Sequence, residues 1–201
     1  MKAKKSIFLI SFLSLAVALS AQAAYEEKPQ EAMPFNVYTE QNATTNHFVP
    51  SGWMGDYGAL RITQACKDNP HSGLTCIKIN YTGEPTQGAG WVGLFWQNPE
   101  NNWGSKDGGF NLSGASKLTF WARGEAEEEN IEFKVGGITG AYPDSDTAGI
   151  GPIKLSKEWK QYTIDLQGLE LFYISGGFVI AASRIDNPGG FAIYIDDIIY
   201  E

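Results

Sequence analysis

Aromatic side chains in a polar, glycine-rich segment are the feature of this sequence with the clearest chemistry. Three of the six tryptophans lie within residues 90–104, GWVGLFWQNPENNWG. The C–H face of a sugar ring stacks on an aromatic ring, while neighbouring amide, carboxylate and guanidinium groups pair with its hydroxyls. The segment therefore suggests a glycan-binding surface. The alternative is that these rings pack the core and the rims of long loops.

Strand alternation decides which of these rings reach the surface. In WVGLFWQ (91–97), successive side chains point to opposite faces, so a core position for Val92 and Leu94 also buries Trp96. Trp91 and Gln97 then face outward. Trp103 follows in the segment NPENNWG, where we expect its ring to edge a cleft.

A second strand pattern presents another tryptophan. In KLTFWAR (117–123), Leu118, Phe120 and Ala122 share one face and should point into the core, as should Ile131, Phe133 and Val135 of IEFKV. Trp121 and Arg123 would then lie on an outer sheet face. We predict the following ligand-binding residues: Trp91, Gln97, Asn102, Trp103, Trp121 and Arg123.

Strand patterns dominate the chain. Short segments rich in β-branched and aromatic residues alternate with turn residues, and no sustained helical repeat is present. These patterns predict an all-β fold, an antiparallel β-sandwich (jelly roll) of about nine or ten strands. The candidate strands are Phe35–Thr39, Ala59–Thr63, Leu74–Tyr81, Trp91–Gln97, Lys117–Arg123, Ile131–Gly136, Ile153–Leu155, Gln161–Leu166, Phe172–Ala181 and Phe191–Tyr200.

The first residues predict export. A lysine-rich start, an apolar run and the small-residue pattern Ala21-Gln22-Ala23 are typical of a signal peptide over residues 1–23. No later segment is apolar and long enough to suggest membrane insertion. We expect a flexible lead-in over 24–34, one domain over 35–201, and a secreted or periplasmic monomer.

The net charge of the chain without its signal peptide limits which partners it can bind. Removing the signal's three lysines leaves 12 basic against 23 acidic residues, a formal charge of −11. Without a basic cluster, such a surface repels phosphate backbones, so nucleic acid is not expected as a partner. Cys66 and Cys76 are the only cysteines, and in an exported chain we expect them to form a disulfide.

Catalytic patterns are weak. No pair of acids falls in a recognisable glycosidase arrangement, and His47 and His71 lack metal-ligand spacing. We leave the question of an enzyme open and lean towards no catalysis. A small glycan hydrolase or lyase would use acids in the 91–107 or 142–146 loops.

Four segments in order suggest a family. HSGLTCIKINY (71–81), LSGASKLTFWARG (112–124), LSKEWKQYTIDLQG (155–168) and FAIYIDDIIYE (191–201) resemble the galactose-binding-like jelly-roll domains. Among these, the chain is most similar to carbohydrate-binding modules related to those of secreted glycoside hydrolases. The resemblance covers roughly residues 35–201.

This resemblance implies a structural calcium ion near the chain ends. Its ligands would be Asp196 with the adjacent Asp197, the loop around Ser72, and Glu40 after the first strand. Calcium takes six to eight hard oxygen ligands, including backbone carbonyls.

We therefore expect a secreted, non-catalytic protein that binds a polysaccharide or oligosaccharide on an aromatic platform. The alternatives are the small glycan hydrolase or lyase, and an adhesion or structural protein of the envelope.

Overall fold

A computed structural model describes residues 28–201. The predicted signal peptide and the first residues of the predicted lead-in lie outside this range. The remainder of the lead-in runs beside the segment 107–114. The Glu31 N–H donates to the Asn111 carbonyl (2.9 Å), and Lys28 pairs with Asp107 (3.3 Å).

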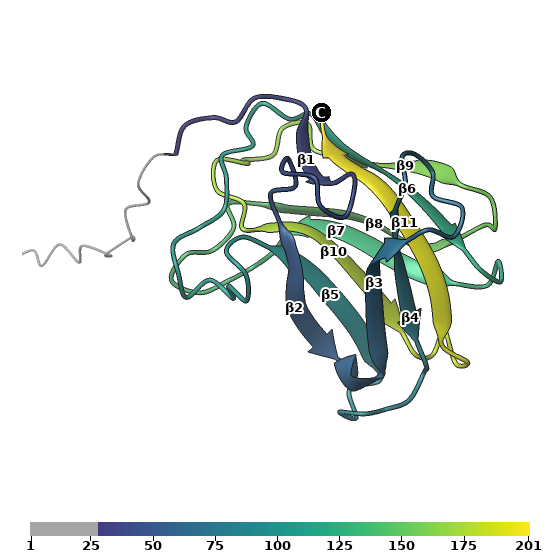
Figure 1. The fold of residues 1–201 in the computed structure, drawn as a ribbon. Helices are drawn as coiled ribbons and strands as arrows, with labels where there is room; N and C mark the ends of the chain where they lie inside the picture. Colours follow the sequence, from purple (N-terminus) through teal and green to yellow (C-terminus); the bar gives the residue numbers. More distant parts are fainter. Residues whose placement is uncertain (1–27) are drawn as a thin grey trace, which may run out of the picture.

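The structure is an antiparallel β-sandwich (Figure 1). Its strands are β1 (Phe35–Tyr38), β2 (Val49–Gly55), β3 (Leu60–Cys66), β4 (Cys76–Tyr81), β5 (Trp91–Gln97), β6 (Lys117–Gly124), β7 (Asn130–Gly136), β8 (Thr147–Lys154), β9 (Lys160–Asp165), β10 (Gly176–Ser183) and β11 (Phe191–Tyr200). One 3₁₀ turn, η1 (Tyr57–Ala59), connects β2 to β3.

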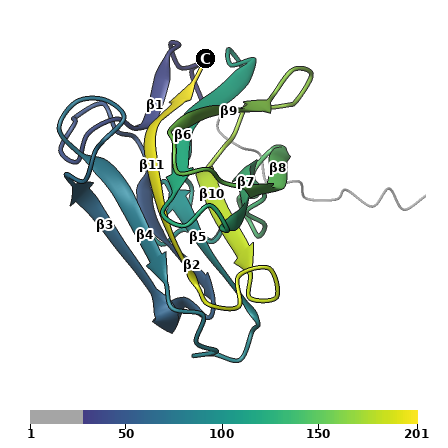
Figure 2. The same cartoon turned by 90° about the vertical axis from the view of Figure 1, so that its right-hand side faces the viewer.

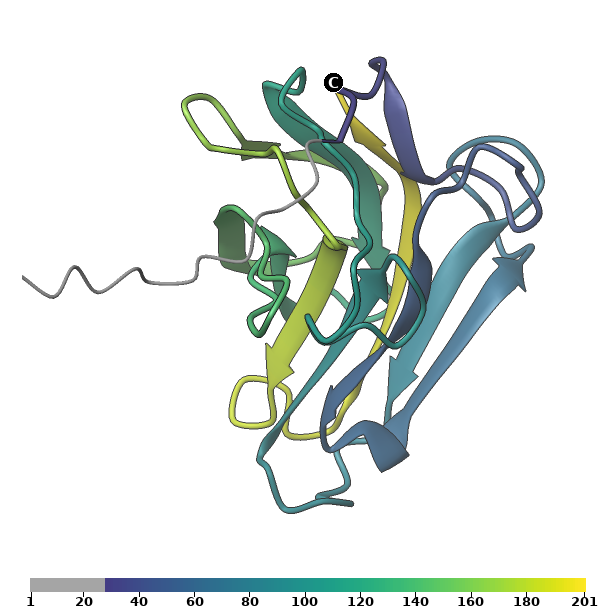
Figure 3. The same cartoon turned by 90° about the vertical axis from the view of Figure 1, so that its left-hand side faces the viewer.

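The strands form two sheets. A six-stranded sheet has the order β3-β4-β11-β6-β9, with β1 also paired to β11, and a five-stranded sheet has the order β2-β5-β10-β7-β8. Figures 2 and 3 show the two layers from opposite sides. The predicted all-β sandwich is confirmed, with eleven strands over residues 28–201 where nine or ten were expected.

Two strands of the five-stranded sheet differ from the sequence prediction. β2 was not predicted, because VPSGWMG contains a proline and two glycines, which weaken a strand pattern. The predicted segment 153–155 is only the end of β8, which begins at Thr147 and contains Gly149, Gly151 and Pro152. Both are edge strands, where proline and glycine are tolerated because one ladder of hydrogen bonds is missing.

The core lies between the sheets, as the alternation predicted. Leu118, Phe120 and Ala122 of β6 are fully buried, and Ile131, Phe133 and Val135 of β7 are too. The Phe120 and Phe133 ring centroids are 4.6 Å apart. This packing fixes which side of each strand faces outward.

Within residues 28–201, no helix is long and apolar enough to cross a membrane.

Candidate functional site

The outer face of the five-stranded sheet carries an exposed tryptophan at the start of β5. Val92, Leu94 and Trp96 lie in the core, so Trp91 points outward and its side chain is 41% exposed. This confirms the outward direction predicted for Trp91. Gln97 was also predicted to face outward but is completely buried, because the loop after β5 covers it. Further along the same outer face, Phe95 packs with Val179 and Ile138.

Glycines and a buried carboxylate position Trp91. A Cβ atom at Gly93 or Gly55 would overlap neighbouring atoms, and Gly55 has a φ of +63°, which favours glycine. The Asp56 N–H donates to the Trp91 carbonyl (2.8 Å). The buried Asp56 carboxylate accepts the N–H groups of Gln87, Ala89 and Gly90, so it also holds the loop that leads into Trp91.

Trp103 is displayed from the loop that follows β5. Its side chain is 45% exposed, and its ring meets the Phe95 ring edge-to-face, with centroids 5.7 Å apart and an interplanar angle of 83°. Trp91 and Phe95 are four positions apart on β5, so their Cα atoms are about 13 Å apart at about 3.3 Å per residue. Trp103 therefore lies over the Phe95 end of the outer face, and Trp91 lies at the other end of the strand.

Gln97 and Asn102 support the Trp103 loop from inside. Both are completely buried, and the Gln97 side-chain amide donates to the Asn102 carbonyl (2.8 Å). The Asn102 side chain accepts the N–H groups of Gly104 (3.1 Å) and Lys106 (3.2 Å), and it donates to the Lys106 carbonyl (2.9 Å). The structure thus places these two predicted ligand-binding residues beneath Trp103, where they position it.

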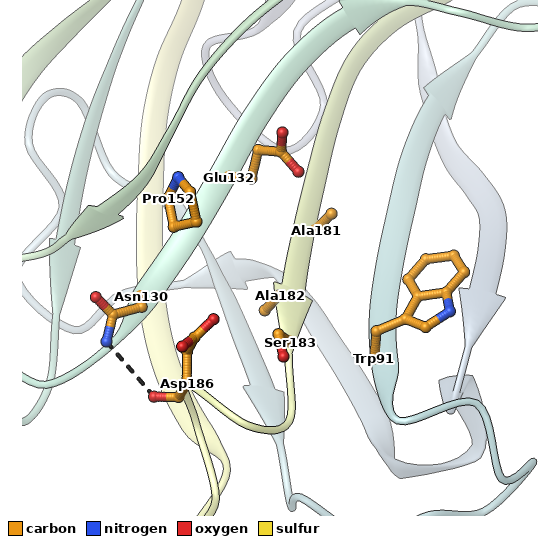
Figure 4. A pocket seen from close by; sticks show the side chains of 8 residues that line it. All are labelled: Trp91, Asn130, Glu132, Pro152, Ala181, Ala182, Ser183 and Asp186. Atoms are coloured by element: carbon orange, nitrogen blue, oxygen red, sulfur yellow. Dashed lines mark hydrogen bonds between the residues drawn. The ribbon is translucent and has the colours of Figure 1, made fainter.

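An open hollow of about 240 Å³ lies on the same sheet face, between Trp91 and β8 (Figure 4). In Figure 4 the Trp91 ring turns away from the other labelled side chains. The hollow is lined by Trp91, Asn130, Glu132, Pro152, Ala181, Ala182, Ser183 and Asp186.

Small side chains and polar groups share this hollow. Ala181 and Ser183 of β10 lie between Trp91 and the polar groups of β7. Glu132 of β7 pairs with Lys134 (2.9 Å), and the Asn130 side-chain amide donates to the backbone carbonyl of Asp186 (3.5 Å). Alternation places Glu132 on the outer face, but Asp186 comes from a loop whose path the sequence does not reveal.

Trp121 and Arg123 lie on the other side of the sandwich, on the outer face of the six-stranded sheet. Trp121 is half-buried, because His71 stacks on it with centroids 3.7 Å apart and an interplanar angle of 15°. The Arg123 guanidinium lies 3.6 Å from the Tyr194 ring centroid and 5.3 Å from that of Trp159. The six predicted ligand-binding residues therefore fall on two opposite faces.

The predicted calcium ligands gather around one loop, residues 71–75. The Asp196 carboxylate is fully buried and accepts the N–H groups of His71 (3.0 Å) and Ser72 (3.3 Å). The Ser72 hydroxyl donates to Asp197 (3.0 Å). The Glu40 carboxylate accepts the N–H groups of Leu74 (2.6 Å) and Thr75 (3.1 Å).

The predicted calcium ligands have suitable chemistry for the ion, and in this structure their oxygens take part in hydrogen bonds. Carboxylate and hydroxyl oxygens are ligands that calcium prefers. Here the Asp196 and Glu40 carboxylates accept backbone N–H groups, and the Ser72 hydroxyl donates to Asp197. Among residues 28–201, no three or more His, Cys, Asp or Glu side chains are grouped so that they could hold a metal ion. Burial, together with the neighbouring Asp197 carboxylate, raises the pKa of Asp196 to about 7.

The predicted disulfide is not formed in the structure. Cys66 and Cys76 are both buried free thiols. They are direct partners across β3 and β4, beside Tyr194 and Trp159, and they bracket the loop that covers Trp121. Burial raises the pKa of the Cys76 thiol to about 12.

The acids of the 142–146 and 91–107 loops make structural contacts. Asp144 accepts the N–H groups of Ile138 (3.0 Å) and Ser175 (2.6 Å). Asp107 pairs with Lys28 and accepts the Tyr173 hydroxyl (3.2 Å). These contacts connect the loops that border Trp103 to the rest of the sandwich.

Comparisons with solved structures place this fold among known domains. A family 30 carbohydrate-binding module is 15% identical, with a TM-score of 0.56 over 85% of this chain and 99% of the other. The family 30 module of a cellulosomal cellulase of Clostridium thermocellum is 15% identical, with a TM-score of 0.55 over 85% and 98%. The chain therefore shares the β-sandwich fold of these modules.

A further similar structure is the family 11 module from Clostridium thermocellum, in complex with a β-1,3-1,4-mixed-linked tetrasaccharide. It is 14% identical, with a TM-score of 0.50 over 85% of this chain and 96% of the other. No protein-family model matches the chain, and no curated protein matches it significantly.

The support beneath Trp103 predicts a stability effect. Asn102→Ala leaves the N–H groups of Gly104 and Lys106 without their side-chain acceptor inside the loop. We expect the free energy of unfolding to fall by about 1–3 kcal/mol, measured by urea denaturation. Ser105→Ala, at an exposed neighbour, should change it by less than about 0.5 kcal/mol. Equal stabilities for the two variants would contradict the supporting role of Asn102.

Proposed function

We propose that this protein binds a polysaccharide or oligosaccharide, without catalysis, on the outer face of the five-stranded sheet. Trp91 and Trp103 would stack on sugar rings, and the polar groups of the hollow beside Trp91 would pair with hydroxyls. We also propose that the protein is exported, because residues 1–23 have the pattern of a signal peptide.

One observation carries the proposal. Two indoles are each more than 40% exposed on the same sheet face. Buried hydrogen bonds from Asp56 and Asn102 hold the backbone around them. Exposed large aromatic side chains on a rigid support lose little entropy when a ligand stacks on them, so their display favours binding.

The solved modules add support at the level of fold. A mixed-linked tetrasaccharide is bound by one of them, and that protein shares this chain's architecture. We expect weak binding at a single site, because stacking and solvent-exposed hydrogen bonds only slightly exceed the cost of ordering the ligand.

Tryptophan substitutions on the two faces test the proposal. In native gels containing soluble neutral polysaccharides, the unsubstituted protein should be retarded without release of reducing sugar. Trp91→Ala and Trp103→Ala should each weaken the apparent affinity about fivefold to a hundredfold, since stacking on one ring contributes on the order of 1–3 kcal/mol. Trp121→Ala is the matched control on the opposite face and should bind as the unsubstituted protein does.

The pattern of losses distinguishes the alternatives. Loss of binding only in Trp121→Ala or Arg123→Ala would move the site to the six-stranded sheet. Sugar release that one Asp or Glu substitution abolishes would indicate a hydrolase or lyase. Absence of retardation on every polysaccharide would contradict the proposal.

We also propose a structural calcium ion held by Asp196, Asp197, Glu40 and Ser72. The support is the resemblance, the gathering of these residues around one loop, and the complete burial of the Asp196 carboxylate. Binding would require the 71–75 loop to exchange N–H groups for carbonyl oxygens.

Melting experiments test the ion directly. An ion that binds only the folded state stabilises it by mass action. We expect millimolar calcium to raise the melting temperature relative to EDTA, and Asp196→Asn to lose this difference. Identical melting curves in calcium and EDTA would contradict the proposed calcium site. They would not bear on the description of the fold.

Oxidation of Cys66 and Cys76 to a disulfide is a further proposal, which rests on the predicted export. Directly opposed residues of antiparallel strands have Cα atoms about 4.5–5.5 Å apart, within the range that a disulfide spans. The S–S bond would form as the two thiols pass two electrons and two protons to a small disulfide such as oxidised glutathione, whose own S–S bond breaks to give two thiols.

Alkylation tests this bond. After oxidative folding, the unfolded and unreduced protein should not react with iodoacetamide, and reduction should expose both thiols. The Cys66→Ser/Cys76→Ser variant should lose about 2–3 kcal/mol of stability, because the cross-link restricts the unfolded chain. Full labelling without reduction would show that the thiols stay free.

A further inference from the structure

The first described residues of the chain lie against the loop that follows β5. Gln30 pairs with Asn111 in an isolated parallel bridge, and the Glu31 N–H donates to the Asn111 carbonyl (2.9 Å). The Asn111 side-chain amide donates in turn to the Lys28 carbonyl (2.9 Å). Asn111 thus holds the backbone of residues 28–31 at a fixed position on this loop.

This docking directs the Lys28 side chain onto a polar cluster. Its ammonium lies 3.3 Å from the Asp107 carboxylate and 5.4 Å from the centroid of the Tyr173 ring. Tyr173 is buried, and its hydroxyl donates to Asp107 (3.2 Å) and accepts the Gly108 N–H (2.9 Å). A cation that lies between a carboxylate and an aromatic face is attracted by both.

The position of the Lys28 backbone makes this ion pair more effective than an isolated surface pair. An isolated pair contributes little, because ordering two long side chains offsets their attraction. Here the Lys28 side chain is only 24% exposed, and a hydrogen bond to its carbonyl already holds the main chain. Less conformational freedom is therefore lost when the ammonium reaches Asp107.

Asp107 belongs to the same short segment as Trp103. Asn102 holds this segment from inside, where its side chain accepts the Lys106 N–H (3.2 Å). Lys106 is followed directly by Asp107, so the pair with Lys28 holds the end of the segment from outside. The exposed indole of Trp103 lies in the chain between these two attachments.

We propose that Lys28 is a positioning residue for glycan binding, because its contact with Asp107 fixes the segment that displays Trp103. The inference rests on the proposed function. A loop that samples fewer conformations presents the Trp103 ring for stacking in a larger fraction of the molecules, and the apparent affinity rises with that fraction. The N-terminal segment thus contributes to affinity without contacting the ligand.

The mobility of the Trp103 ring tests this contact without any ligand. The measurement is the heteronuclear ¹H–¹⁵N Overhauser effect of each indole N–H, which reports motion on the picosecond-to-nanosecond timescale. We expect Lys28→Ala to lower this value for Trp103 and to leave that of Trp91 unchanged, and Lys28→Arg to restore it. Lys157→Ala, at an exposed lysine between β8 and β9, is the matched control and should change neither value.

Affinity tests the consequence for binding. The probes are soluble mixed-linked β-glucan, xylan and galactan, and the variants are compared on the one that the unsubstituted protein binds best. Lys28→Ala should weaken the affinity about twofold to fivefold, the range expected for one partly exposed ion pair. Asp107→Asn should have the same effect, because it removes the charge but keeps an acceptor for the Tyr173 hydroxyl. The double variant should bind no more weakly than either single variant, since both substitutions remove the same contact.

The outcomes separate this inference from the proposed function. Melting curves check that the variants fold. An unchanged affinity in folded Lys28→Ala, or a loss of affinity with no change in the Trp103 signal, would overturn the positioning role and leave glycan binding in place. Additive losses in the double variant would overturn it too, because the two residues would then act independently. If the unsubstituted protein binds none of the probes, the proposed function and the role of Lys28 in it both fail.

Discussion

The two-residue period of strands packed on a shared core determines where every candidate ligand contact lies. In β5, burying Val92, Leu94 and Trp96 directs Trp91 and Phe95 to the outer face of the sheet. A register slip of one residue would move the inward side chains of β5 to the outer face and the outward side chains into the core. The core packing of the whole sandwich therefore keeps Trp91 exposed. The same rule in the other sheet directs Trp121 to the opposite exterior, beyond the reach of a ligand on Trp91.

The outer faces of the two sheets differ in whether their aromatic rings are exposed or covered. On the five-stranded sheet, buried polar groups hydrogen-bond the backbone around Trp91 and Trp103 and leave the rings open. On the six-stranded sheet, His71 stacks on Trp121, and Arg123 lies over Tyr194. One face is therefore available to a flat ligand. The other is occupied by the protein's own loop, which Asp196 and Asp197 hold in place.

Strand alternation was enough to predict the fold class, the core side of β6 and β7, and the outward direction of Trp91. It did not reveal β2, where Pro50 and Gly52 weaken the pattern. It also gave the wrong impression of Gln97, because a polar residue at an outward position can be buried by a loop. Whether a loop covers a side chain depends on distant segments: residues 67–75 cover Trp121, and the loop after β10 supplies Asp186. Local periodicity carries no information about such paths.

The central claim is that the five-stranded face, with Trp91 and Trp103, is the surface that contacts glycan. The six indole N–H signals in a ¹H–¹⁵N spectrum, each assigned by substitution, report on this claim during titration with a neutral oligosaccharide. The account predicts that the signals of Trp91 and Trp103 shift and saturate together, while those of Trp121 and Trp159 stay in place. Shifts confined to Trp121 and Trp159 would contradict it.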